Sequence, residues 1–297
     1  MKVVTIKFTA KNDKAMKIFV LGSTGMLGRY VSTYLKSQGH DVINVTRDQI
    51  DARNVKEAEL RAILFHMGLK QGDVIINCIG MIKQKKEVTD LEFILVNSVF
   101  PRILANVCES EKAKLIHITT DCVFSGLRGL YNEEDTHDPT DMYGKSKSFG
   151  EPSNCTVIRT SIIGEELKGK LSLIEWVKSM KNKTVDGYTN HHWNGLTCLQ
   201  LAKVFEDIIV NNKYWTGVRH IFSNTLTKAE LVNTICWIYG LNVTVNPMET
   251  SIKCDRTLST IYNDRQYLMS NIVLPIPNLE TQIIEQLDFY SILSKKD

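Results

Sequence analysis

The stretch that decides the fold is Gly22-Ser23-Thr24-Gly25-Met26-Leu27-Gly28. It follows the apolar run 17–21 directly and leads into a segment in which apolar residues recur at helical spacing. Glycines in a strand-to-helix turn permit a tight bend and let a pyrophosphate approach backbone N–H groups at the helix N-terminus. The alternative is a plain turn without a ligand. We favour a dinucleotide-binding turn, because a second apolar run follows about twenty residues later, at 41–45.

From Lys17 onward, short β-branched runs alternate with longer amphipathic segments. That order produces right-handed βαβ crossovers, and so predicts an α/β fold with a Rossmann-type doubly wound parallel sheet. The runs are mostly continuous and apolar, as buried parallel strands require. We expect strands at 17–21, 41–45, 73–79, 114–119, 156–160 and 218–223. We expect helices at 25–37, 54–67, 89–109, 197–210 and 279–293.

The alternating pattern loosens after about residue 160, where a strand-like run at 242–246 and a segment with Pro275 and Pro277 follow. This change predicts a smaller C-terminal α/β domain that binds substrate. Met16 begins a natural first strand, so the residues before it are predicted to be an extension. The predicted divisions are 1–15 for the extension, 16–161 for the Rossmann domain with segments around 184–224 returning to it, and 162–297 for the mainly substrate-binding domain.

Composition places the chain among ordinary globular proteins. Of its 297 residues, 43% are hydrophobic and 23% are charged, with 36 Lys and Arg against 33 Asp and Glu. A chain of this length buries enough surface to fold without disulfides or metals. No block of basic residues resembles a nucleic-acid-binding tail, so we predict no nucleic-acid partner.

The seven cysteines are scattered, odd in number and without a C-x-x-C pair. This pattern argues against a disulfide framework and a zinc ribbon, and indicates reduced thiols. Lysines interrupt the region where a signal peptide would need an apolar core, and the apolar runs are shorter than a membrane span. We therefore expect a cytoplasmic protein without a metal or a membrane partner, and leave a homodimer open.

Two regions beyond the glycine turn are candidates for the cofactor site. Arg47 follows the second predicted strand, where an NAD-selective site usually carries an acidic residue, so it favours pairing with the 2′-phosphate of NADP. Two alternatives remain, namely that Asp48 takes the acidic role or that Arg47 is a solvated surface charge. Asp51 is a candidate for the adenine edge. The run 77–80 closes the third strand and is a candidate for the nicotinamide side.

Tyr143 and Lys147 are four residues apart, which places them on one face of a helix. An unperturbed tyrosine has a pKa of about 10, and a neighbouring ammonium stabilises the phenolate and lowers that pKa. Tyr143 can then deliver a proton to a carbonyl oxygen whose carbon receives a hydride. The spacing alone is common on solvated helices. The order of motifs along the chain outweighs that alternative.

That order is the glycine turn, the run 77–80, Thr119-Thr120-Asp121-Cys122-Val123-Phe124, and the segment from Asp138-Pro139 to Tyr143-Gly144-Lys145-Ser146-Lys147. With these pieces the chain resembles an extended short-chain dehydrogenase/reductase. It is most similar to the dTDP-4-dehydrorhamnose reductase branch, which modifies nucleotide-linked 4-keto-6-deoxy sugars. The resemblance covers nearly everything from Met16 onward, and includes Arg159-Thr160-Ser161 and Arg256.

The resemblance implies a role for individual residues. Thr120 is expected to hydrogen-bond the C4 carbonyl, Tyr143 to donate the proton, and Lys147 to hold the nicotinamide ribose, with hydride coming from NADPH. Arg159 is expected to be structural, and Arg256 to contact the nucleotide diphosphate. The cofactor-binding residues expected from motifs and resemblance together are Gly22, Thr24, Gly25, Met26, Leu27, Gly28, Arg47, Asp51, Cys78, Ile79, Gly80, Asn97, Tyr143 and Lys147.

Cys122 departs from the pattern of the simple reductases, which usually have tyrosine there. Dehydratases of this family have glutamate, so cysteine argues against dehydration. In related bifunctional enzymes a cysteine at this place is the base of a C3 epimerisation that precedes reduction, which requires a thiol with a depressed pKa, here from Lys147 and the pocket. The alternative is a buried, inert thiol. The acid partner is ambiguous, with Lys170 and Lys178 as candidates.

The substrate is implied by resemblance alone. TTDCVFSG at 119–126, together with 172–176 and 194–197, is similar to the branch found in acetamido-sugar pathways. This favours a UDP-linked sugar, perhaps 2-acetamido, and an activated L-rhamnose-type product. The substrate-binding residues implied are Thr120, Asp121, Cys122, Trp176, Asn194 and Arg256. The rival is a non-catalytic NADP-binding subunit like the regulatory subunit of methionine adenosyltransferase, in which the Thr–Tyr–Lys group would be lost.

Overall fold

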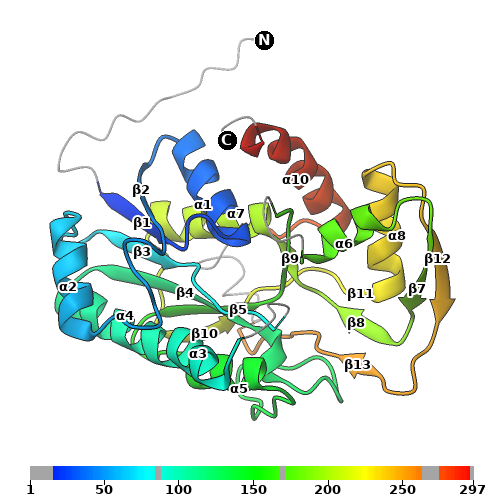
Figure 1. Ribbon diagram of the computed structural model, residues 1–297, viewed down its shortest axis with the longest axis horizontal. Helices are drawn as coiled ribbons and strands as arrows, with labels where there is room; N and C mark the ends of the chain where they lie inside the picture. Colours follow the sequence, from blue (N-terminus) through cyan, green and yellow to red (C-terminus); the bar gives the residue numbers. More distant parts are fainter. Residues whose placement is uncertain (1–15, 84–87, 167–170, 263–273, 295–297) are drawn as a thin grey trace, which may run out of the picture.

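Six parallel strands form the central sheet, in the order β10-β5-β4-β3-β1-β2 (Figure 1). The strands are β1 (Lys17–Leu21), β2 (Asp41–Val45), β3 (Val74–Asn77), β4 (Lys114–Thr120), β5 (Thr156–Thr160) and β10 (Gly217–His220). The computed structural model describes residues 16–83, 88–166, 171–262 and 274–294, so the predicted extension 1–15 lies outside the described residues. The strand order reverses direction between β1 and β3. In doubly wound sheets ligands bind at such a switch point, beyond the carboxyl ends of the strands.

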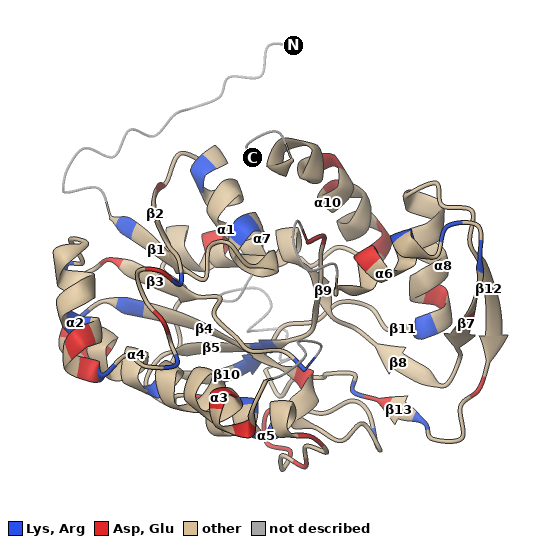
Figure 2. Cartoon of the chain, in the orientation of Figure 1, with Lys and Arg blue, Asp and Glu red and all other residues tan. Residues whose placement is uncertain are grey.

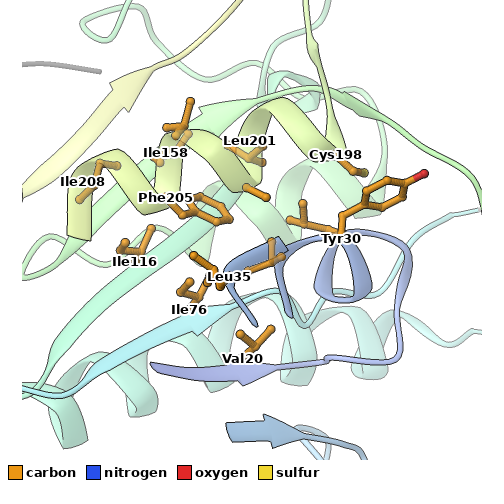
Figure 3. Packing of buried hydrophobic residues seen from close by; sticks show 14 of the residues in the cluster. Val20, Tyr30, Leu35, Ile76, Ile116, Ile158, Cys198, Leu201, Phe205 and Ile208 are labelled. Atoms are coloured by element: carbon orange, nitrogen blue, oxygen red, sulfur yellow. The ribbon is translucent and has the colours of Figure 1, made fainter. Parts of the chain in front are cut away.

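Helices cover both faces of this sheet. They are α1 (Met26–Ser37), α2 (Glu57–His66), α3 (Asp90–Ile94), the π-helical turn η1 (Leu95–Val99), α4 (Phe100–Ser110), α5 (Met142–Phe149) and α7 (Cys198–Val210). Successive residues of a strand point to opposite faces, so Ile18 and Val20 pack with α1 and α7 while Phe19 and Leu21 pack with α2 and α4. Figure 3 shows the first of these clusters around Phe205 and Leu35. The predicted Rossmann-type fold is confirmed.

The C-terminal part of the chain builds a smaller α/β region beside the sheet (Figure 1). Its helices are α6 (Leu173–Ser179), α8 (Lys228–Ile238) and α10 (Leu279–Leu293). Its short strands are β6 (Ile162–Ile163), β7 (Thr184–Tyr188), β8 (His191–Trp193), β9 (Leu196–Thr197), β11 (Leu226–Thr227), β12 (Thr244–Met248) and β13 (Cys254–Asp255). A separate apolar cluster, which includes Ile174, Leu231 and Ile283, holds this region together. The chain returns to the main sheet with α7 and β10, while the domain boundaries themselves stay a prediction.

The predicted bounds agree with the structure where the apolar pattern is regular. β1, β2 and β5 have the predicted bounds, and α10 matches 279–293. The predicted helix 89–109 is continuous but changes its winding at η1, just before Pro101, which lacks the N–H that a regular helix interior uses. The predicted strand 242–246 lies two residues later, as β12.

The helical stretch Asp90–Ser110 also corrects the expectation that every apolar run is too short to cross a membrane. With 21 residues and a mean hydropathy of 1.4 it passes that test by length and composition. More than half of it, 56%, is buried inside the fold. Leu104 and Val107 of α4 pack against the sheet, which accounts for the apolar composition without a membrane.

A buried ion pair between Arg159 and Glu151 ties α5 to the strands β5 and β10. Arg159 on β5 is only 2% exposed, and its guanidinium donates to Glu151 at 2.6 Å and to His220 at 2.7 Å. Glu151 follows directly after α5, so the contact joins that helix to β5 and β10. This placement agrees with the structural role expected for Arg159.

Candidate active site

The backbone atoms of the glycine turn between β1 and α1 pack tightly against one another. Gly22 has a φ of +73°, a conformation that side chains disfavour. A Cβ on Gly28 would lie 2.8 Å from the Gly22 carbonyl carbon and 2.9 Å from the Ser23 Cα, closer than real Cβ contacts. The N–H groups of Gly22 and Ser23 both donate to the Val45 carbonyl oxygen, at 2.9 and 3.2 Å, which anchors the turn to the end of β2.

The N-terminus of α1 is suited to an anion. Gly25 is its N-cap and offers no side-chain cap, and the first turn, Met26-Leu27-Gly28-Arg29, contains no carboxylate. The first N–H groups of a helix have no partner within the helix, and its dipole attracts negative charge. Together with the tight turn, this arrangement fits the pyrophosphate of a dinucleotide.

A cavity of about 910 Å³ extends from this turn to the ends of β3 and β4 and on to the C-terminal region. Nine of the expected cofactor residues line it: Thr24, Gly25, Met26, Leu27, Cys78, Ile79, Gly80, Tyr143 and Lys147. Three of the expected substrate residues also line it: Thr120, Asp121 and Cys122. The cavity therefore lies at the switch point of the sheet, where doubly wound folds bind their ligands.

Thr120 and Tyr143 meet because α5 packs closely on the end of β4. Thr120 ends β4 and caps the 3₁₀ turn η2 (Asp121–Val123), where its hydroxyl accepts from the Cys122 N–H at 3.2 Å. A Cβ on Gly144 would collide with the Cys122 carbonyl oxygen, so only glycine lets α5 approach this turn. Asp141 caps α5 by accepting from the Gly144 N–H at 2.8 Å. As a result the Thr120 hydroxyl lies close enough to the Tyr143 phenol to act on it and lower its pKa.

Burial controls the protonation of Tyr143 and Lys147. It raises the pKa of Tyr143 above its ordinary value, and the neighbouring Cys122 adds to the rise. The expectation of a lowered pKa for Tyr143 is therefore wrong for the structure, because burial disfavours the phenolate. Burial lowers the pKa of Lys147 to about 8, against the opposing charge of Glu151. At neutral pH Tyr143 is a protonated acid and Lys147 is a cation.

Asn97 lies behind the cavity wall rather than in its lining, and its expected cofactor contact stays a prediction. It is fully buried in η1, donates to the Met81 carbonyl at 3.0 Å and accepts from the Met81 N–H at 2.8 Å. It also donates to the Ser146 hydroxyl at 3.1 Å. Asn97 therefore ties the loop after β3 to α5, and positions the wall that Gly80 and Lys147 share.

Two further cofactor predictions, Arg47 and Asp51, concern residues outside the cavity lining and stay predictions. Arg47 is exposed and lies outside the cavity lining, whereas its neighbour Thr46 lines it. Asp51 also lies outside the lining, because the guanidinium of Arg53 holds its carboxylate, with Arg53 Nε 3.0 Å from Oδ1. This contact lowers the pKa of Asp51.

Of the substrate-binding residues expected from resemblance, three do not line the cavity: Trp176, Asn194 and Arg256. Trp176 is 37% exposed on α6 and does not line the cavity. Asn194 is buried, donates to the Leu258 carbonyl at 2.8 Å and accepts from the Leu258 N–H at 3.0 Å, and does not line the cavity. Arg256 donates through Nε to the Phe124 carbonyl at 2.8 Å. Its guanidinium lies near enough to Asp121 and Cys122 to lower the pKa of each, although it is not part of the lining.

The thiol of Cys122 is protonated in this structure. Burial, followed by the Asp121 carboxylate, raises its pKa to about 12. The expected depression of this pKa is therefore wrong in direction, and the alternative of a neutral thiol is favoured. Of the two candidate acid partners, Lys170 lies outside the described residues, and Lys178 pairs with Glu175 at 3.0 Å.

Several residues of the cavity were not predicted. Arg29, Ser32, Thr33 and Lys36 recur at helical spacing on α1 and line the cavity. Glu165, 2% exposed, also lines it and accepts hydrogen bonds from Tyr30, Tyr239 and Gln286, which joins α1 to α8 and α10. Lys228 lines it from the C-terminal region. Helical spacing from Arg29 was the one signal in the sequence that could have shown part of this set.

Charge and metal ligands add little specificity to the site. Figure 2 shows acidic and basic residues interspersed over both parts of the molecule rather than gathered in one patch. Within the part of the chain that the structure describes, no group of three or more His, Cys, Asp or Glu side chains is placed to hold a metal ion.

This fold and site define a Rossmann-type α/β protein with a Thr–Tyr–Lys group. Residues 16–235 match the model of the RmlD substrate binding domain family, and the chain therefore belongs to that family. A protein of Mycolicibacterium smegmatis named dTDP-4-dehydrorhamnose reductase is 34% identical over 140 residues, which are 46% of this chain and 41% of that protein. The chain spans about half the length of the first curated relatives it matches.

Two other similarities extend further along the chain. Methionine adenosyltransferase 2 subunit beta of Mus musculus is 24% identical over 256 residues, which are 77% of this chain and 74% of that protein. A crystal structure of dTDP-4-dehydrorhamnose reductase from Bacillus anthracis, in complex with NADP, superposes with a TM-score of 0.77 and 19% identity. It covers 93% of this chain and 99% of that one, and supports the fold.

Proposed function

We propose that this protein is an oxidoreductase that uses NADPH to reduce the C4 ketone of a nucleoside-diphosphate 4-keto-6-deoxyhexose. The observation that carries the proposal is the convergence of Thr120, Tyr143 and Lys147 on one cavity wall beyond the glycine turn. Several curated relatives are named as reductases of dTDP-linked 4-keto sugars, which supports the same class of substrate.

The residues around the glycine turn fit a dinucleotide. The close approach of Gly28 to Gly22 leaves backbone rather than side chains facing the α1 N-terminus. The absence of a side chain at Gly80 leaves room for the Lys147 ammonium, because a Cβ on Gly80 would lie 3.1 Å from the ammonium nitrogen. NADPH, when bound, supplies the hydride. Cys78, Ile79 and Gly80 form the neighbouring wall, and Lys147 contributes the cation at that end.

The chain's own chemistry is the transfer of a proton. The Thr120 hydroxyl and the Tyr143 phenol line the same cavity and lie close enough to influence each other, so both can reach one carbonyl oxygen. As the ketone carbon gains a hydride, its oxygen gains a proton from the Tyr143 hydroxyl, and the product is the C4 alcohol. Lys147, four residues further along α5 and in the lining of the same cavity, supplies a cation on the helix face of the phenolate that remains.

The finer substrate assignment rests on the motif at 119–126. We propose a UDP-linked sugar, with a 2-acetamido group and an L-rhamnose-type product as its most specific form. The test measures NADPH oxidation with UDP-, dTDP- and GDP-linked 4-keto-6-deoxyhexoses made by dehydratases, with product stereochemistry determined by NMR. Preference for UDP-linked sugars supports the assignment, and preference for dTDP- or GDP-linked sugars contradicts it.

The same panel separates the enzyme from the regulatory alternative. The family includes a protein named as a subunit of methionine adenosyltransferase, whose name describes no reduction. The presence of Thr120, Tyr143 and Lys147 favours catalysis here. Tight binding of NADPH without turnover of any sugar in the panel would instead favour the binding subunit.

Epimerisation at C3 depends on Cys122 acting as a base. A thiol with a pKa of about 12 is almost entirely protonated at neutral pH. We therefore expect turnover in heavy water to place no deuterium at C3, and Cys122→Ser to retain ketone reduction. The measurement is NMR of the product. Deuterium at C3 in the native protein, lost in C122S, would restore the epimerase role.

The pKa of Lys147 predicts how NADPH affinity depends on pH. Its folded value of about 8 lies below the ordinary value, so the ammonium is present below pH 8 and is lost as the pH rises through it. The dissociation constant for NADPH, measured by fluorescence from pH 7 to 9.5, should therefore rise above about pH 8. Lys147→Met should remove this step, and the exposed control Lys145→Met should keep it. A flat profile in the native protein would contradict the assignment.

A further inference from the structure

Lys228 is held rigidly at the start of α8. Thr227 and Glu230 form a capping box, in which the Thr227 hydroxyl accepts from the Glu230 N–H at 3.2 Å and the Glu230 carboxylate accepts from the Thr227 N–H at 2.7 Å. β11 pairs with β8, with Leu226 opposite Trp193. These contacts place the Lys228 ammonium 5.9 Å from the centre of the Trp193 ring.

Both side chains belong to the wall that the C-terminal region contributes to the cavity. Figure 1 shows α8, β8 and β11 on the side of the molecule away from α2 and α4. The ammonium is close enough to the Asp121 carboxyl and the Cys122 thiol to influence their ionisation, and burial lowers its own pKa. Lys228 therefore lies near the group that includes Thr120, but comes from the other part of the fold.

No carboxylate lies within 4.0 Å of the Lys228 ammonium among residues 16–83, 88–166, 171–262 and 274–294. The nearest in sequence, Glu230, is engaged in the capping box. The Lys228 side chain is half-buried, and an ammonium, with three N–H donors and no acceptor, loses part of its hydration at such a place unless oxygen acceptors replace it. The position is suited to a ligand that brings such acceptors into the cavity.

We propose that Lys228 is a specificity-determining residue that donates hydrogen bonds to oxygens on the hexose of the sugar nucleotide, next to the reacting carbon. This inference rests on the proposed function. Trp193 restrains the ammonium and is a positioning residue. Charged hydrogen bonds select strongly against ligands that lack the acceptor, so Lys228 favours sugars with a hydroxyl or acetamido oxygen at that place.

The test compares ligands that have and lack the hexose. Calorimetry in the presence of saturating NADP⁺ measures the binding of UDP-N-acetylglucosamine, dTDP-glucose, UDP and dTDP to the native protein, K228M and K228R. We expect K228M to lose about tenfold or more in affinity for at least one sugar nucleotide while keeping its affinity for UDP and dTDP. K228R, which keeps the charge, should recover part of the loss. The control K253M removes an exposed lysine outside the cavity and should bind as the native protein does.

Each other outcome overturns the proposal. Unchanged binding of both sugar nucleotides to K228M removes Lys228 from recognition. Equal loss for UDP and dTDP assigns the ammonium to the diphosphate instead of the hexose. Loss of NADPH affinity in K228M shows a structural role, since NADPH does not need this contact. Because the probes are stable and only bind, the result decides the role of Lys228 even if the native protein reduces none of the 4-keto sugars, which is the failure of the proposed function.

Discussion

Replacing Tyr143 with phenylalanine is expected to slow ketone reduction by about 10²–10⁴-fold, the range that loss of a general acid produces. The change removes only the hydroxyl that meets Thr120, and leaves the ring packed against Phe93 at a centroid distance of 6.5 Å. NADPH affinity should therefore stay within about threefold of the native value, well under the tenfold that 1.4 kcal/mol represents. The measurements are steady-state NADPH oxidation and fluorescence titration of NADPH.

A matched control is Tyr188→Phe on β7, where the side chain is 37% exposed and does not line the cavity. It should turn over at the native rate. Native turnover by Y143F would remove Tyr143 from the mechanism. Parallel loss of turnover and NADPH affinity would show that the phenol has a structural role instead.

The second large effect is expected from Gly28→Ala. The added Cβ would meet the backbone of Gly22 and Ser23, which side-chain rotation cannot relieve. Overpacking of this kind costs about 1–3 kcal/mol, and here the strain falls on the turn that receives the pyrophosphate. We expect NADPH affinity to fall by about 100-fold or more, which corresponds to about 2.8 kcal/mol, and the melting temperature to fall as well.

Gly25→Ala is a second variant in the same turn, with a smaller steric conflict than Gly28→Ala. A Cβ on Gly25 would lie 3.3 Å from the Gly22 carbonyl oxygen, a tight contact that a small shift relieves. Its melting temperature should therefore lie between those of the native protein and G28A. Fluorescence titration of NADPH and thermal unfolding check both variants. G28A with native affinity for NADPH would show that the turn is a plain connection.

The elements that could be predicted from the sequence are those whose pattern is local. Strands β1 and β5 are continuous apolar runs, and the glycine turn lies between one of them and a helix with regular spacing. The four-residue spacing of Tyr143 and Lys147 put both on one face of α5 and into the cavity. In each case a short stretch of chain holds the whole signal.

The residues that could not be predicted depend on contacts between distant segments. Lys228 reaches the cavity because β11 pairs with β8, a register that no local pattern fixes. Asn97 lies behind the cavity wall because α5 packs on η1, where a Cβ on Gly150 would collide with the Asn97 carbonyl oxygen. Neither the pairing of β11 with β8 nor the packing of α5 on η1 can be predicted from the residues next to Lys228 or Asn97 in the sequence.

Trp176 shows where resemblance and the described geometry part. Ile174 and Val177, three residues apart on α6, are fully buried in the C-terminal cluster. Trp176 lies outside that stripe and is exposed. It shares a helix face with Leu173, which lines the cavity, so its substrate contact stays a prediction. Burial likewise decided the protonation of Cys122, and burial depends on the packed fold rather than on sequence spacing.

The central claim is that Thr120, Tyr143 and Lys147 act on a ketone beside a bound dinucleotide. The most direct test is reduction of the 4-keto sugar panel with NADPH deuterated at the transferable position of the nicotinamide, with NMR of the sugar product. We predict one deuterium at C4 of the hexose, and no such product with Y143F on the same timescale. Absence of deuterium at C4 from every sugar in the panel, with NADPH bound, would contradict the account.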